Sequence, residues 1–140
     1  MKRTLFILIF FPVVILASDL DTVDTDLREV SSGGYWSFGN EEGFLRFIVL
    51  GGGIDHYKTK LYVQWLTTGT DFEKSKIYKS VSIHELNESP VYSFGLPKCI
   101  RNSVCRSISI NAKNTYDLSE HLIQIQLTEP GNYVYKSEAL

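Results

Sequence analysis

The stretch KLYVQWL, residues 60–66, decides the fold class. Its apolar side chains recur at every second position, at Leu61, Val63 and Trp65. Successive side chains of a β-strand point to opposite faces of its sheet, whereas a helix repeats after about 3.6 residues. The stretch therefore predicts a strand with these three side chains in the core and the residues between them at the surface.

Other segments along the chain share this composition and rhythm. They are residues 35–38, 44–50, 77–86, 91–96, 104–112, 121–127 and 132–136. Turn sequences separate them, such as the three glycines at 51–53 and EPGN at 129–132. Seven or eight short strands with one polar side predict an antiparallel β-sandwich, with a small β-barrel as the alternative. A short helical turn is expected only at 116–120.

Residues 1–18 have the layout of a cleavable secretion signal. The cations Lys2-Arg3 precede the uncharged run LFILIFFPVVIL, residues 5–16, and two small residues follow it. Twelve residues are too few for a stable membrane span, which needs about 20. We therefore predict export to the periplasm or the medium, with an uncleaved tether as the alternative.

Beyond the signal we predict a loose acidic arm at residues 19–32 and a single β domain at 33–140. The chain has 14 Lys and Arg and 16 Asp and Glu, and loss of the two signal cations leaves a net charge of −4. This acidic balance, with no basic cluster, argues against nucleic acid and anionic lipid as partners. No later stretch is long and apolar enough to span a membrane.

Cys99 and Cys105 are the only cysteines, and the five residues between them allow the chain to turn. Export would place them in an oxidising compartment, where a disulfide persists. The spacing is not C-x-x-C, so it does not indicate a zinc knuckle or a thioredoxin-like redox motif. We predict a structural disulfide, with free or redox-active thiols as the alternative.

Each of the three histidines, His56, His84 and His121, has an acidic neighbour in the sequence. Three histidines in one site would suit Zn²⁺. The strand rhythm, however, predicts that His56 and His84 face solvent while His121 faces inward. Motifs for a nucleophile elbow or a phosphate-binding loop are also missing. We therefore predict no metal, no cofactor and no catalytic residue.

Candidate binding residues concentrate between residues 34 and 66. The set is Tyr35, Trp36, Arg46, Asp55, His56, Tyr62 and Gln64. If Arg46 has a structural role instead, we expect it to form an ion pair with Asp55 or another nearby acid. If the residues at 46, 56, 62 and 64 share one solvent-facing side, they form a mixed aromatic and polar patch. Such surfaces bind proteins or sugars more often than they catalyse.

Part of this segment resembles a known group of proteins. The sequence GYW from residue 34, then GFLRFIV from 43, GIDH from 53 and VQWL from 63 is similar to small exported bacterial proteins with no assigned activity. The resemblance covers residues 33–86 and excludes both cysteines. It implies a bacterial periplasmic address and supplies no catalytic residue.

These features favour an exported, non-enzymatic protein that binds another macromolecule, a protein or a glycan. An inhibitor, an immunity protein and an envelope accessory factor all fit, and the sequence leaves the oligomeric state open. One alternative is a small metal-dependent or hydrolytic enzyme that uses His56 or His84. A second is a carbohydrate-binding module in which Trp36 and Tyr62 form a stacking platform.

Overall fold

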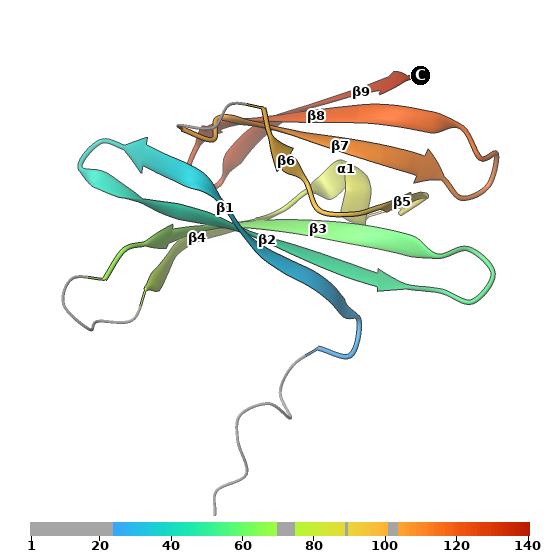
Figure 1. Cartoon of the computed structure of the whole chain (residues 1–140), viewed down its shortest axis with the longest axis horizontal. Coiled ribbons are helices and arrows are strands. Elements are labelled where there is room, and N and C mark those ends of the chain that lie inside the picture. The colour runs from blue at the N-terminus through green and yellow to red at the C-terminus, as the bar shows by residue number, and fades with distance from the viewer. Residues whose placement is uncertain (1–23, 70–74, 89, 101–103) are drawn as a thin grey trace, which may run out of the picture.

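A computed structural model of the chain describes residues 24–69, 75–88, 90–100 and 104–140. They form two stacked β-sheets, which Figure 1 shows as two layers. The first sheet has the order β1-β2-β3-β4, and the second has the order β5-β7-β8-β9 with β6 also paired to β7. Every pairing between these described strands is antiparallel. The predicted antiparallel sandwich is thus confirmed, and the barrel alternative is not.

The strands have these bounds. The first sheet contains β1 (Leu27–Phe38), β2 (Glu41–Gly52), β3 (Lys58–Thr67) and β4 (Lys76–Ser82). The second contains β5 (Tyr92–Phe94), β6 (Lys98–Cys99), β7 (Ser107–Asn114), β8 (Glu120–Glu129) and β9 (Asn132–Ala139). A four-residue helix, α1 (His84–Asn87), lies on the connection between the sheets. The predicted secretion signal lies outside the described residues.

The core lies between the inner faces of the sheets. In β3 the alternation places Leu61, Val63 and Trp65 at no more than 2% exposure, as predicted. The isoleucines of β7 and β8 meet them from the second sheet, and Ile108 and Ile123 are fully buried. Each such side chain contributes about 1.5–3 kcal/mol by leaving water, so this shared core holds the sheets together.

The described part of the chain contains no helix that is both long enough and apolar enough to cross a lipid bilayer.

The first strand begins inside the segment that the sequence assigned to a loose arm. Residues 27–32 pair with β2, ending in the pair Ser32–Arg46. The two glycines that were expected to end the arm instead lie within β1, where its register shifts between Ser32 and Tyr35. Gly34 is needed there because a Cβ would lie 2.7 Å from the Cβ of Cys105. The arm therefore ends before Leu27.

The helix is not at 116–120, where we expected a helical turn, but at α1. The strand predicted for 77–86 ends at Ser82, because the side chain of Asn87 replaces a backbone partner of β3. Its amide nitrogen donates to the carbonyl oxygen of Leu61, and its oxygen accepts from Leu61 N–H, both at 2.8 Å. Asn87 is only 8% exposed, and its side chain gives the Leu61 N–H a partner, while the Leu61 carbonyl oxygen also accepts from Ile83 N–H at 3.1 Å.

The disulfide Cys99–Cys105 is present and joins β6 to the chain just before β7. Its Cys105 N–H donates to the carbonyl oxygen of Tyr35 at 2.8 Å, and Tyr35 also forms an isolated bridge with Val104. The bridge therefore holds the chain before β7 against β1.

The first prediction concerns Gly43, which pairs with Trp36 and lies beside β3. The Trp36 indole donates to the carbonyl oxygen of Leu66 at 3.1 Å, and a Cβ on Gly43 would lie 1.8 Å from that oxygen. Gly43→Ala should destabilise the fold by about 1–3 kcal/mol in a denaturant titration. In the control Gly52→Ala, the nearest atom is 4.0 Å away, and stability should stay within about 0.5 kcal/mol. Equal effects of both variants would contradict this account.

The second prediction concerns the disulfide. Replacing both cysteines with serine should lower the free energy of unfolding by roughly 2–2.5 kcal/mol, because the unfolded chain gains the entropy of a short open loop. Urea unfolding of the variant and of the oxidised protein measures the difference. An unchanged unfolding midpoint would contradict a stabilising role of the bridge.

Candidate functional site

The outer face of the first sheet carries many apolar side chains, although it faces away from the core. A polar row of Ser32, Arg46, Gln64 and Ser80 crosses it, and Lys60 lies beside Leu50. The apolar members of this outer face are Val30, Phe44, Ile48, Leu50, Tyr62 and Leu66, with Tyr35 at one end. They neighbour one another across strands: Ile48 pairs with Val30 on β1 and with Tyr62 on β3. Val30 is 49% exposed and Phe44 46%. We call this surface, together with Arg46 and Gln64, the apolar face.

The second sheet provides an internal comparison, because its outer face has the usual polar composition. Most outward residues of β7 and β8 are polar, namely Ser107, Ser109, Asn111, Gln124 and Gln126, and Leu122 is the apolar one among them. Antiparallel sheets with one side in water normally alternate apolar inward and polar outward residues. The first sheet departs from this rule and the second follows it, so the apolar face is specific to β1–β3.

Arg46 and Gln64 lie inside the apolar face as a cross-strand pair. The Arg46 Nε–H donates to Gln64 Oε1 at 2.8 Å, and Gln64 Nε2 lies 3.5 Å from Ser80 Oγ on β4. Among the described residues, no carboxylate lies within 4.0 Å of Arg46. The pairing of Arg46 with Asp55 expected from the sequence is therefore not formed, and a neutral amide holds the guanidinium instead.

Of the seven predicted binding residues, the apolar face brings together Arg46, Tyr62, Gln64 and, at its end, Tyr35. The Tyr35 ring packs edge-on against Phe44 with centroids 6.1 Å apart. Its hydroxyl donates to the carboxylate of Glu42, and this hydrogen bond raises the pKa of Tyr35. The neutral phenol is therefore the form that contributes to this end of the face.

The other three predicted residues lie elsewhere. Trp36 is 3% exposed and faces the core, so the expected stacking platform of Trp36 with Tyr62 does not exist. Asp55 and His56 lie in the turn between β2 and β3. His56 Nδ1 is 2.9 Å from the carbonyl oxygen of Thr115, and its ring stacks on Tyr116. This histidine thus contacts the β7–β8 turn of the opposite sheet rather than the apolar face.

The histidines do not converge on a metal site. His84 is exposed beside Glu88, with His84 Nδ1 3.5 Å from a Glu88 oxygen, while His121 is half-buried against Tyr92, as its inward orientation predicted. Throughout the described ranges, no group of three His, Cys, Asp or Glu side chains is arranged to hold a metal ion.

His121 has a serine neighbour, but the geometry is not that of a nucleophile. Ser119 Oγ lies 3.0 Å from His121 Nε2 and donates its proton to Asp117 Oδ1 at 2.6 Å. In a catalytic triad the serine donates to the histidine, and the acid orients the other ring nitrogen. Here the acid binds the serine, and hydrogen bonds from Ser119 lower the pKa of Asp117. The arrangement orders a turn.

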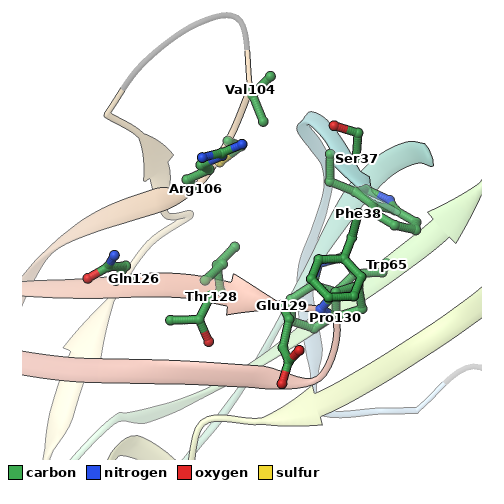
Figure 2. A pocket seen from close by; sticks show the side chains of 12 residues that line it. Ser37, Phe38, Trp65, Val104, Arg106, Gln126, Thr128, Glu129 and Pro130 are labelled. Atoms are coloured by element: carbon green, nitrogen blue, oxygen red, sulfur yellow. The ribbon is translucent and has the colours of Figure 1, made fainter. Parts of the chain in front are cut away.

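A recess of about 370 Å³ opens where β1 and β8 end (Figure 2). Figure 2 shows Arg106 and Val104 on one side and Phe38 beside Trp65 on the other. Trp65 is only 2% exposed, so its ring faces are not available for stacking. The rim charge Arg106 is exposed, and no hydrogen bond or ion pair to another described residue orients its side chain. The apolar face, which holds an oriented polar pair, is therefore the better candidate site.

Sequence reasoning missed Val30, Ile48 and Leu50. The signal was available in FLRFIVL, residues 44–50, because this run is apolar at both odd and even positions. An antiparallel strand that is apolar on both sides indicates that something covers its second side. The pairing that aligns Val30 with Ile48 requires the strand register, which the sequence pattern did not supply.

The fold and this surface define a small disulfide-bonded β-sandwich protein with an apolar outer sheet face. Comparison with protein-family models, with curated proteins and with solved structures found no match.

The third prediction follows from the geometry around Ser119. Because its hydroxyl donates to Asp117, Ser119 should not react with a fluorophosphonate probe, and the intact mass of the treated protein should stay unchanged. Trypsin treated in parallel verifies the probe. A single adduct that disappears in Ser119→Ala and in His121→Ala would contradict this geometry and favour the hydrolase hypothesis.

Proposed function

We propose that this protein is an exported, non-enzymatic β-sandwich that binds another protein through the apolar face. The observation that carries the proposal is the contrast between the two outer faces, rich in apolar side chains on β2 and β3 and mostly polar on β7 and β8. Contiguous apolar surface on a soluble protein marks interaction sites, because leaving it in water costs free energy.

The size of the apolar face suits this role. Three strands spaced by about 4.8 Å and six residues rising about 3.3 Å each give a surface of roughly 300 Å². That area is on the order of the largest apolar patch on a typical monomer, which is often functional. A standard interface of about 800 Å² per partner would extend beyond it onto a polar rim.

The sheet edges support the same conclusion. The outer edge strand β4 carries Lys76 and Lys79 and an extra residue, Tyr78, that shifts its register against β3. The edge strand β9 carries an ion pair between Lys136 and Glu138 at 2.6 Å. Lysines, charges and bulges on edge strands prevent pairing with other chains. Because these two edges are protected and the apolar face is not, the face is best explained as a surface kept for a partner.

Export is part of the proposal. It is supported by the signal-like layout of residues 1–18, by the disulfide, and by the resemblance of residues 33–86 to exported bacterial proteins. In the periplasm or the medium, a small stable binding domain fits an inhibitor, an immunity protein or an envelope accessory factor.

The fourth prediction tests the apolar face directly. The mature protein is immobilised and exposed to bacterial envelope extract beside two variants, Ile48→Lys and Ser109→Lys. Both positions are half-buried on the outer side of a strand inside a sheet, so the two substitutions are matched. Ile48→Lys should reduce retention of a captured protein at least about tenfold, because it places an unpaired cation in the interface. Ser109→Lys should retain it.

Thermal melts of both variants verify that they are folded. Equal retention of each captured protein by Ile48→Lys and by wild type would overturn the proposal. Equal loss in both variants would also count against it, because the binding would then not be specific to the apolar face.

A further inference from the structure

Arg46 is the one charged side chain at the centre of the apolar face. It is half-buried between Phe44 and Ile48 on the outer side of β2. Its Nε–H is already used, since it donates to Gln64 Oε1 at 2.8 Å. The two terminal Nη groups make no hydrogen bond or ion pair with any other described residue. The guanidinium therefore presents oriented but unused donors, with polar Ser32 and Gln64 on the neighbouring strands and apolar residues on either side along β2.

A partner that covers this surface must supply a counter-charge. Burying an unpaired cation costs several kcal/mol, which would cancel much of the gain from apolar contact. Gln64 holds one side of the planar guanidinium, and this leaves the Nη side for a bidentate acceptor. A carboxylate matches that geometry.

Within the described residues, the face itself does not supply this carboxylate. Asp24 is the only described acid that lines the recess over the face. Leu27, three residues after it, pairs with Leu50, whereas Arg46 pairs with Ser32. Five residues of extended strand separate these pairs, roughly 15 Å. A symmetric contact between two copies centred on the face would also bring two Arg46 cations together. The occupant that fits best is thus a different protein.

We propose that the partner contributes an Asp or Glu carboxylate that binds Arg46, flanked by apolar side chains that pack on Ile48 and Tyr62. This inference rests on the proposed function and specifies the chemistry of its partner. Arg46 is then the anchor that sets the register of the contact, while the apolar residues supply the buried area.

A displayed random peptide library provides the test without a known partner. It is panned on the mature protein and on Arg46→Glu, and only peptides whose binding Ile48→Lys abolishes are counted. Peptides selected on wild type should be enriched in Asp or Glu next to apolar residues. Peptides selected on Arg46→Glu should be enriched in Lys or Arg. Thermal melts verify that the variants are folded.

A double-mutant cycle on one selected peptide gives the coupling. Changing its acid to the amide should weaken binding to wild type at least about tenfold and leave binding to Arg46→Gln within about twofold. The variant Arg46→Lys keeps the charge but loses the planar fork. For this variant, changing the peptide acid to the amide should weaken binding by a factor between those for wild type and for Arg46→Gln.

The possible failures are distinguishable. Peptides that depend on Ile48 but show no acidic preference would overturn this inference and leave the proposed function standing. The absence of any peptide that depends on Ile48 would count against the proposed function as well. A dimer of the free protein in light scattering that Ile48→Lys dissociates would overturn the assignment of the face to a different protein.

Discussion

Two apolar sheet faces pack against each other at the centre of this protein, and every other feature depends on that contact. Leu61 and Val63 of β3 are fully buried, as are Ile108 and Ile123 on the opposite sheet. The core fixes which side of each strand faces outward, because a shift of one residue would exchange the two sides. With the sides fixed, cross-strand pairing brings Arg46 beside Gln64 and Ile48 beside Tyr62. The apolar face is thus a consequence of the register that the core imposes.

The two-residue rhythm of the sequence was sufficient to predict the sandwich and the burial of Trp65, and the spacing of the two cysteines to predict the disulfide. It could not predict α1, because Asn87 acts there through side-chain bonds to Leu61, 26 residues away in the chain. It also placed the start of the domain too late, since the glycines before Tyr35 look like a break but admit the disulfide against β1. The periodicity of apolar residues predicts which side of a strand is buried. It does not predict which distant segments of the chain contact each other, and these features depend on such contacts.

The candidate site, too, could be predicted from the sequence only in part. Strand phase placed Tyr62 and Gln64 on one side of their strand, and the pairing of β2 with β3 brings Arg46 to the same surface. Strand phase also predicted that His56 faces solvent, and His56 is exposed, but it lies in a turn away from the apolar face. It left open Trp36, which lies in the core and donates to Leu66. The pattern also drew attention to polar and aromatic residues, while the property that distinguishes this surface is its aliphatic content. A partner-binding role accounts for both that content and the single oriented cation.

Carbene footprinting of the mature protein, alone and in complex with the protein it captures, tests the central claim most directly. The account predicts that labelling of Val30, Ile48 and Tyr62 falls in the complex, while labelling of Ser109 and Gln124 on the other outer face is unchanged. Unchanged labelling of the first group, with protection of the second sheet or of the recess beside Arg106, would contradict it.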